Sequence, residues 1–318
     1  MKKENKLVKK VKRLLRRLGC PRWLHRFGPK TYEFLDHLSA LLIRAYCRLS
    51  YRRTRQLLDL LGIRCPSKSA LQYTACKLNS AFWQKLLSIT CSNTYLVAVD
   101  STGLSRTNPS YHYLRRIDGK LPSIPIKLST AFDTRKKKFC AAKIRVLSAH
   151  DIRDAEGLLQ HSNPTIAVAD KGYVSERLYR YAHEQGILLM MPTKRNAKRG
   201  HYRKKMHKHF RLRTYHRRSI VETSFSCIKR LFGASVSSKT VRAIRTEVYC
   251  RLVCYNLFSL IYRLLGQSRN GGGSVENAQK LRAFGAQEAQ GLLCESCSGI
   301  LLLWIIHMRI IIPRGTSQ

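Results

Sequence analysis

The sequence predicts an α/β protein in which an all-helical region precedes the sheet. Two short apolar runs, Tyr95–Val99 and Thr165–Ala169, have the length and composition of buried strands. A helical pattern and a further apolar run at Ile187–Met191 follow the second run and complete a strand–helix–strand unit. Before position 90 the apolar residues recur at helical spacing instead. We therefore expect a helical region over residues 1–90, a sheet domain over residues 91–265, and a linker with an appended tail of uncertain origin over residues 266–318.

The composition predicts a globular chain that binds a polyanion. Its 318 residues are 44% hydrophobic, which is enough for a buried core. Lys and Arg total 60 against 18 Asp and Glu, and the formal net charge is +42. This charge favours nucleic acid, which binds basic proteins by releasing counterions. An anionic membrane surface and a ribosomal RNA scaffold are the alternatives, although ribosomal proteins are usually smaller and poorer in aromatic residues.

A cytoplasmic, nucleoid-associated location is expected. The 11 cysteines are odd in number and lack a paired spacing framework, which fits a reducing compartment. The Cys-x-x-Cys pair Cys294 and Cys297 has no second pair to complete a zinc site. Residues 1–17 lack the apolar core of a secretory signal, and the apolar run at residues 300–312 is too short to span a bilayer.

The helical region contains two helices joined by a short turn. Ser50 caps the first and Gly62 ends it, and the second restarts at Pro66 with Lys68 and Ser69 at its front. The pair resembles a helix-turn-helix, whose second helix enters the major groove of DNA. An ordinary helical hairpin fits the pattern equally well, and the charge of the chain favours DNA contact. The other helices are expected over residues 1–28 and 31–49.

The sheet domain has an aspartate directly after each of its two clearest strands. Asp100 follows Tyr95–Val99, and Asp170 follows Thr165–Ala169. Open α/β sheets carry functional groups at the carboxyl ends of their strands. The other expected elements are strands over residues 125–132 and 139–147 joined by a basic hairpin turn, and helices beginning at residue 150 and over residues 175–184 and 240–265.

A third carboxylate, Glu222, stands alone in a basic stretch. It is the only acidic residue between Glu184 and Glu247. Residues 193–218 before it carry no acid and are rich in Lys, Arg and His, so we expect them to form a loop that follows phosphates.

The helix expected from Ser219 onward gives Glu222 defined neighbours. At about 100° per residue, Tyr215, Arg218, Glu222 and Lys229 share one face if the helix begins early enough. Apolar residues occupy the other side. One face is therefore expected to pack, and the other to present a carboxylate among cations.

Asp100, Asp170 and Glu222 together predict a divalent metal site. Carboxylates brought close to one another repel unless a cation neutralises them, and oxygen ligands suit Mg²⁺ or Mn²⁺. Two such ions can activate water or a 3′-hydroxyl and stabilise the leaving oxygen of a phosphodiester. Taken singly, each acid fits a helix cap or an arginine pair better. The set of three in a chain with few acids favours the metal.

Three motifs resemble those of DDE-type insertion-sequence transposases. The signature Tyr215-x2-Arg218-x3-Glu222-x6-Lys229 matches that of the compact subgroup without gaps. The stretch Ala169–Tyr173 is similar to the second-aspartate motif of the family, and Val97–Gly103 is similar to the first. The resemblance covers about residues 31–265.

The resemblance implies a ribonuclease-H-like mixed sheet with flanking helices and two catalytic Mg²⁺ ions, for which Mn²⁺ can substitute. It implies cleavage and joining of DNA at transposon terminal inverted repeats and target DNA, by a homodimer assembled on DNA. It makes Asp100, Asp170 and Glu222 the metal ligands. Tyr215, Arg218 and Lys229 are implied to contact the terminal phosphate and the DNA end.

Two other functions remain open at this point. A metal-dependent nuclease of the same fold would cleave DNA without joining it. An inactive or domesticated DNA-binding protein would use residues 1–90 alone.

Overall fold

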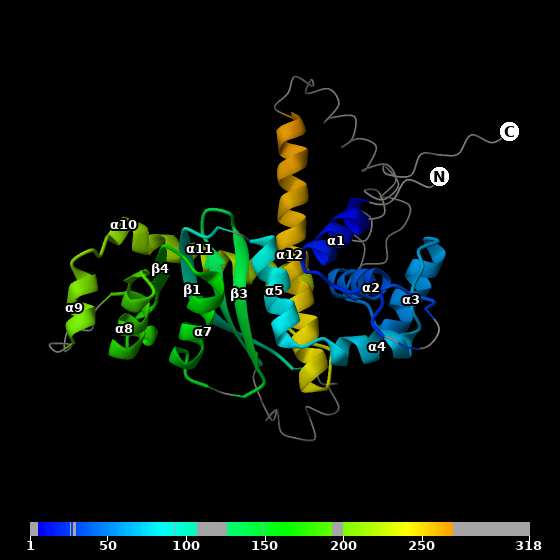
Figure 1. Cartoon of the computed structure of the whole chain (residues 1–318), viewed down its shortest axis with the longest axis horizontal. Helices are drawn as coiled ribbons and strands as arrows, with labels where there is room; N and C mark the ends of the chain where they lie inside the picture. Colours follow the sequence, from blue (N-terminus) through cyan, green and yellow to red (C-terminus); the bar gives the residue numbers. More distant parts are fainter. Residues whose placement is uncertain are drawn as a thin grey trace. The chain divides into compact units, whose positions relative to one another are not determined.

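The computed structural model describes residues 6–25, 27, 30–91, 93–106, 126–147, 149–192 and 200–269 (Figure 1). The chain forms two compact units, one of residues Lys10–Ser259 and one that combines Met1–Lys9 with Leu260–Gln318. The sheet and all the candidate site residues belong to the first unit. The linker predicted from Gln267 begins inside a helix that reaches Arg269. The rest of the predicted tail, with Cys294 and Cys297, lies outside the described residues.

The described part of the chain before the sheet is helical, as predicted. Its helices are α1 (Lys6–Arg17), α2 (Phe34–Tyr46), α3 (Tyr51–Leu60), α4 (Lys68–Lys77) and α5 (Ser80–Thr90). Helix α2 is buried along most of its length because α3 and α4 both pack against it. Helix α5 was not predicted. It begins because the side-chain Oδ1 of Asn79 accepts a hydrogen bond from the backbone N–H of Phe82 at 2.9 Å.

The Ser50 cap predicted for α3 is present, and Ser67 caps α4 in the same way. The Ser50 hydroxyl accepts from the N–H of Arg53 at 3.3 Å, and Ser67 accepts from the N–H of Ala70 at 3.2 Å. Gly62 has a φ of +63°, the left-handed conformation that ends helices. The connection runs over residues 61–67, so it is longer than the turn predicted at residues 63–65.

A five-stranded mixed sheet follows the helices. Its strands are β1 (Leu96–Leu104), β2 (Ile126–Asp133), β3 (Lys138–Arg145), β4 (Ile166–Ala169) and β5 (Leu188–Met190), in the order β3-β2-β1-β4-β5. β2 pairs antiparallel with both β1 and β3, whereas β4 pairs parallel with both β1 and β5. The mixed α/β sheet predicted from the sequence is therefore confirmed.

The prediction that β1 ends at Val99 was wrong. The strand continues to Leu104 because Asp100 and the residues after it still pair with β2, from Asp100↔Thr130 to Leu104↔Ile126. The parallel neighbour β4, in contrast, stops at Ala169. Asp100 therefore lies inside β1, at the level where β4 ends.

The remaining helices, which lie between β3 and β5 and after β5, complete the described fold. They are α7 (Ile152–Ser162), the 3-10 turn η1 (Lys171–Tyr173), α8 (Glu176–Glu184), α9 (His201–His207), α10 (Leu212–Tyr215), the 3-10 turn η2 (His216–Arg218), α11 (Ser219–Phe232) and α12 (Val241–Arg269). The stretch predicted as a basic loop is thus largely helical where the structure describes it, because α9, α10 and η2 occupy residues 201–218. Residues 193–199 lie outside the described residues.

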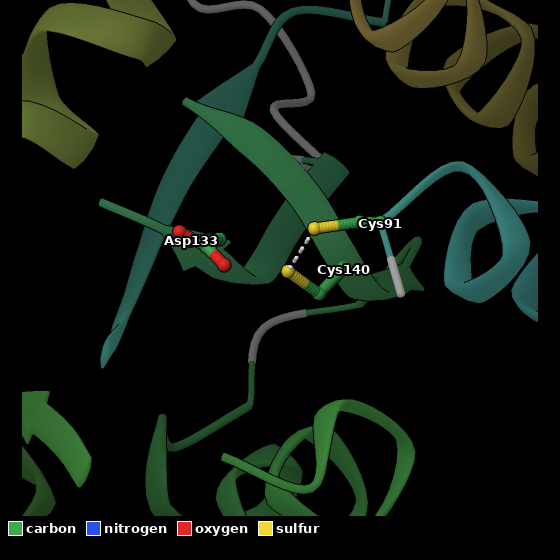
Figure 2. Close-up of side chains that lie close together, drawn as sticks. All are labelled: Cys91, Asp133 and Cys140. Atoms are coloured by element: carbon green, nitrogen blue, oxygen red, sulfur yellow. Dashed lines mark hydrogen bonds between the residues drawn. The ribbon is translucent and has the colours of Figure 1, made fainter. Parts of the chain in front are cut away.

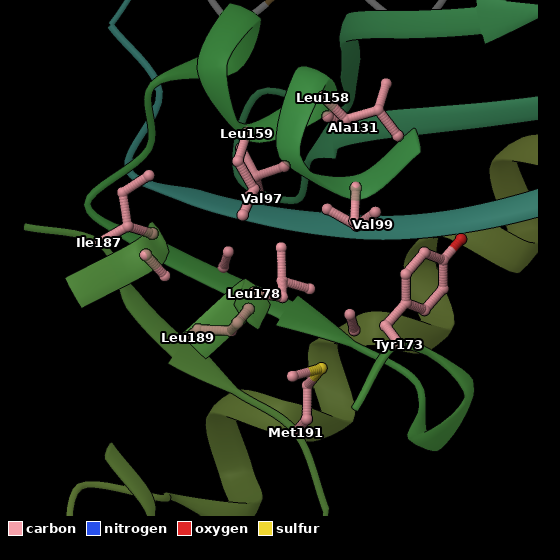
Figure 3. Packing of buried hydrophobic residues seen from close by; sticks show 14 of the residues in the cluster. Val97, Val99, Ala131, Leu158, Leu159, Tyr173, Leu178, Ile187, Leu189 and Met191 are labelled. Atoms are coloured by element: carbon pink, nitrogen blue, oxygen red, sulfur yellow. The ribbon is translucent and has the colours of Figure 1, made fainter. Parts of the chain in front are cut away.

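Alternate strand residues build the two faces of the sheet. Val97, Val99 and Ala131 face a core that also contains Leu158 of α7 and Leu178 of α8 (Figure 3). On β2 the next residue, Phe132, contacts the rings of Phe139 and Tyr255, which brings α12 onto the opposite side. The ring of Phe225 on α11 stacks near Phe139 at 6.4 Å between centroids. This packing fixes α11, the helix that carries Glu222.

The edge strand β3 is covered by side-chain amides. Gln84 of α5 donates to the carbonyl of Cys140 at 3.1 Å and accepts from the N–H of Ala142 at 3.0 Å. Asn256 of α12 accepts from the N–H of Phe139 at 2.9 Å and donates to its carbonyl at 2.7 Å. An exposed edge would offer these backbone groups to another strand. Helices α5 and α12 therefore close this side of the sheet.

Candidate active site

Asp100 and Asp170 lie at adjacent positions on neighbouring strands. The last parallel pair of β1 and β4 is Val99↔Ala169, and each aspartate is the next residue of its strand segment. Asp170 leads directly into the turn η1, which takes the chain away from the sheet. Both side chains are half-buried. The structure therefore places the two carboxylates at one level of the sheet, although only Asp170 follows the end of its strand.

Glu222 meets these aspartates through Arg218. The Arg218 guanidinium donates from Nη1 to Asp100 Oδ2 at 3.1 Å and from Nη2 to Glu222 Oε1 at 3.0 Å. Val221 and Phe225 bury the opposite side of α11, so Glu222 projects outward with 58% of its side chain exposed. The single guanidinium thus bridges a strand carboxylate and a helix carboxylate.

The charges at this site are strongly coupled. Burial raises the pKa of Asp100, and the negative charges of Glu222 and Asp170 raise it further, against the Ser101 N–H and Arg218, which lower it. Burial acts to lower the pKa of Arg218, but Asp100, Asp170, Tyr215 and Glu222 outweigh it and hold that pKa above its ordinary value. The site therefore gathers three carboxylates around one cation.

These residues fit a divalent metal ion chemically. Carboxylate oxygens are the ligands that Mg²⁺ and Mn²⁺ prefer, and the Arg218 guanidinium already holds a positive charge between two of the three acids. Ligand atoms of the three acids do not all come within 4.8 Å of one another. In the described chain, only Cys91, Asp133 and Cys140 meet that distance. The three carboxylates would therefore have to come closer together, and Arg218 between Asp100 and Glu222 would have to move aside, before they could share an ion.

The other predicted DNA-contact residues lie in two regions: Tyr215 and Lys229 on α10 and α11, and Lys68 and Ser69 on α4. Tyr215 ends α10 and is half-buried beside Phe210, with 5.7 Å between ring centroids. Lys229 lies on α11, two turns beyond Glu222, and is half-buried. Lys68 and Ser69 are exposed at the start of α4, which packs on α2 and α3. The structure thus groups Arg218 with the carboxylates, whereas Lys68 and Ser69 belong to the helical region.

A fourth acid, Asp151, supports the site and was not singled out in the sequence. Asp151, just before α7, accepts a hydrogen bond from the Ser101 hydroxyl at 2.7 Å and pairs with Lys127 of β2. Burial acts to raise the pKa of Asp151, but hydrogen bonds from Lys127 and Ser101 outweigh it and hold the pKa below its ordinary value. Asp151 therefore fixes the residue that follows Asp100. In the sequence, Asp151 was only an aspartate at the start of a helix. Aspartates are common there because they cap helices, so its position alone did not indicate a site residue.

The C-terminal end of α11 is held by Arg48, which lies just after α2. Arg48 donates from Nε to the carbonyl of Leu231 at 3.1 Å and from Nη2 to the carbonyl of Arg230. Gly233 follows with a φ of +83°, which a residue with a Cβ rarely adopts, and it lies against the Arg48 guanidinium. These contacts satisfy carbonyls that a helix end leaves without partners.

Comparison with known proteins identifies the domain. Residues 92–257 match the family model described as "Transposase DDE domain". None of the described helices is both long enough and apolar enough to cross a membrane.

Solved transposase structures give weaker similarities. The piggyBac transposase synaptic complex with hairpin DNA is 12% identical, with 99% of this chain and 85% of that chain covered and a TM-score of 0.44. The Drosophila P element transposase strand transfer complex is 12% identical, with 77% and 70% covered and a TM-score of 0.33. The Mos1 transposase paired-end complex is 13% identical, with 80% and 89% covered and a TM-score of 0.22. At such TM-scores the family assignment rests on the domain match.

Proposed function

The chain belongs to the transposase DDE domain family, and we propose that it cuts DNA at transposon ends and joins them to target DNA in a reaction that depends on divalent metal. The observation that supports this proposal is the Arg218 bridge between Asp100 and Glu222, with Asp170 beside Asp100. This arrangement brings together carboxylate oxygens from β1, from the residue after β4, and from α11 at a half-buried site.

Asp100, Asp170 and Glu222 are the proposed metal ligands. They would hold two Mg²⁺ ions, or Mn²⁺ in their place, which supply activation of water or a 3′-hydroxyl and stabilisation of the leaving oxygen. The buried environment of Asp100 and the hydrogen bond from the Ser101 N–H at 2.8 Å orient its carboxylate. Glu222, on the exposed side of α11, reaches the site from the direction open to DNA.

Arg218 is proposed to change partners during the reaction. Its forked guanidinium matches a phosphate as well as it matches carboxylates. With a divalent ion neutralising the three acids, Arg218 would be available for the terminal phosphate of the DNA end. Tyr215 and Lys229 would contact the same DNA end from α10 and α11.

The remaining parts of the proposal concern partners and organisation. Residues 1–90 form the proposed DNA-binding region, with Lys68 and Ser69 of α4 facing a major groove, and residues 91–265 form the ribonuclease-H-like catalytic domain. The DNA partners are the terminal inverted repeats and the target, bound by a homodimer. The protein is proposed to be an insertion-sequence transposase of the compact subgroup that works at the nucleoid.

A strand-transfer assay tests this function. The substrate is a labelled duplex that carries the inverted repeat flanking the gene, incubated with Mg²⁺ and a target plasmid. We expect labelled ends to be cut and joined by the full-length protein. Ends that are cut but never joined would indicate the nuclease, and bound ends that are never cut would indicate a DNA-binding protein.

Glu222→Gln provides the matched variant for that assay. It should lower cutting by at least about 100-fold and preserve binding of the end, because it removes a charged metal ligand outside the core. Glu184→Gln is the control, since Glu184 is also 58% exposed and also pairs with an arginine four residues before it. Normal cutting by Glu222→Gln would refute the metal-ligand assignment.

A further inference from the structure

Two cysteine sulfurs lie next to each other in the core, away from the carboxylate site. Cys91 ends α5, Cys140 lies in β3, and their Sγ atoms are 2.9 Å apart (Figure 2). Both are free thiols with exposed fractions of 4% and 1%. The separation is short for two sulfurs that are merely in contact. The side chains therefore already point at each other.

The backbone on both sides of the pair is fixed. Gln84 of α5 bonds both the carbonyl of Cys140 and the N–H of Ala142. Lys138 donates from Nζ to the carbonyl of Thr90, the residue before Cys91, at 3.0 Å. These contacts hold the end of α5 against β3 at the position of the two sulfurs. A bond between them would require side-chain adjustment more than backbone movement.

The surroundings favour a neutral product. Cys91 and Cys140 belong to the apolar core cluster with Val97, Ala141 and Leu158. Burial, and then the neighbouring Cys91 thiol, hold the pKa of Cys140 well above its ordinary value. A disulfide carries no charge, whereas metal binding would need two buried thiolates.

Asp133 makes a metal ion the main alternative occupant. One ligand atom from each of Asp133, Cys91 and Cys140 falls within 4.8 Å of the others. Asp133 Oδ1, however, already accepts from the N–H groups of Arg135 and Lys136 at 2.8 Å each, where it shapes the β2–β3 turn. Tetrahedral zinc with bonds of about 2.3 Å would also separate two sulfurs to roughly 3.8 Å, which is wider than the observed pair.

We propose that Cys91 and Cys140 form a reversible disulfide that links α5 to β3 when the protein meets a peroxide. One thiol loses its proton and attacks a peroxide oxygen, which gives a sulfenic acid and releases water. The second thiol then attacks that sulfur and expels a second water. The two thiols lose two electrons and two protons in total, and hydrogen peroxide is reduced to two waters.

The link has a structural consequence that is independent of the proposed function. It joins residues 91 and 140, so it closes a long loop that contains β1 and β2. A cross-link of this kind stabilises a fold chiefly by restricting the unfolded chain. Because α5 connects the helical region to the sheet, oxidation should stabilise this junction. Because both sulfurs are buried and burial disfavours the Cys140 thiolate, oxidation should be slow.

Peptide mapping of the full-length protein tests the proposal. The protein is treated with hydrogen peroxide, unfolded with an alkylating agent present, and digested without reductant. We expect one linked pair of peptides that carry Cys91 and Cys140, which dithiothreitol separates. Peroxide should also raise the melting temperature of the wild type, and dithiothreitol should reverse the rise.

Three variants, one of them used in a metal measurement, make the test decisive. Cys91→Ser should lose the linked peptides and the rise in melting temperature, whereas Cys254→Ser should keep both, since Cys254 is equally buried but donates to the Leu42 carbonyl. If Cys91→Ser does not fold, the wild-type map still decides. Oxidation of Cys20 or Cys227 without a Cys91–Cys140 link would overturn the proposal. Zinc bound by the wild type and lost in Cys140→Ala would overturn it in favour of a metal site.

Discussion

Arg218 shows how one residue can hold an acidic site together. It bonds Asp100 and Glu222 at the same time, and the charges of all three acids raise its pKa. Without a cation, Asp100 would lie half-buried beside two like charges. Arg218 therefore holds the carboxylates together, and the same guanidinium is proposed to bind the DNA end later.

Arg218→Lys tests this double role. A lysine keeps the charge but lacks the fork, so it can bond only one group at a time. Because it loses one charge-assisted hydrogen bond, Arg218→Lys should cut the labelled end about tenfold more slowly, or slower still. Binding of the DNA end should change little. Single-turnover cleavage of the labelled end measures the cutting rate, with Arg180→Lys as the control because Arg180 pairs with Glu184 at the same spacing. Equal rates in the two variants would contradict the role.

At the residue scale, the sequence pointed to those candidate site residues whose role depends on their position along a single strand or helix. Asp100 and Asp170 stood out because each follows an apolar run, and Arg218 and Glu222 because helical spacing puts them together. Asp151 could not be recognised in the same way. Its role depends on Lys127 and Ser101, which approach it only after β1, β2 and α7 have packed.

At the scale of elements, a buried glutamate joins α2, α12 and the segment after α11. Glu247 accepts from the Ser238 hydroxyl at 2.6 Å and from Arg251 at 2.7 Å, and it lies 3.7 Å from Arg44. Arg44, Glu247 and Arg251 line a cavity of about 200 Å³. Burial acts to raise the pKa of Glu247, but the Ser238 hydrogen bond and both arginines outweigh it and hold the pKa below its ordinary value.

Glu247→Gln should destabilise the fold by about 3 kcal/mol at neutral pH, because it leaves buried arginines without their carboxylate. The stabilisation from a lowered carboxylate pKa is complete above the ordinary glutamate value of about 4.3 and is lost as pH falls through the lower folded value. The difference in urea unfolding between wild type and variant should therefore shrink in acid. Glu184→Gln is the exposed control. A difference that stays constant with pH would contradict the pKa assignment.

Lys68→Ala tests the proposed DNA-facing role of α4. Lys68 is exposed at the front of a helix whose other side packs on α2 and α3. Removing one phosphate contact should weaken DNA binding and lower the slope of log affinity against log salt by about 1. Lys85→Ala on α5 is the matched exposed control. An equal loss in both variants would show that α4 contributes only general charge.

Element boundaries were harder to predict than the elements themselves. β1 was predicted too short, because the apolar run ends at Val99 while pairing with β2 continues to Leu104. α5 was missed, although Asn79 caps it, because its buried face is completed by contacts with the distant β3. α9 and α10 lie in a stretch that was predicted as a loop from its charge.

At the scale of the whole molecule, a strongly basic chain surrounds a small acidic site. The net charge of +42 favours a polyanionic partner, whereas the three carboxylates would repel phosphates unless a cation neutralises them. The sequence predicted the mixed sheet and the set of acids. The approach of α11 to the sheet could not be predicted, because it depends on Phe225 packing near Phe139 and on Arg48 holding the end of α11.

Metal-specific rescue tests most directly the claim that the carboxylates bind the catalytic ion. Asp170→Cys replaces a hard oxygen ligand by a thiolate, which Mg²⁺ binds poorly and the softer Mn²⁺ binds better. Cleavage of the labelled end by this variant should be lost in Mg²⁺ and recover at least about tenfold in Mn²⁺. Asp59→Cys, at an exposed acid on α3, should cut normally in both ions. Full activity of Asp170→Cys in Mg²⁺ would contradict the account.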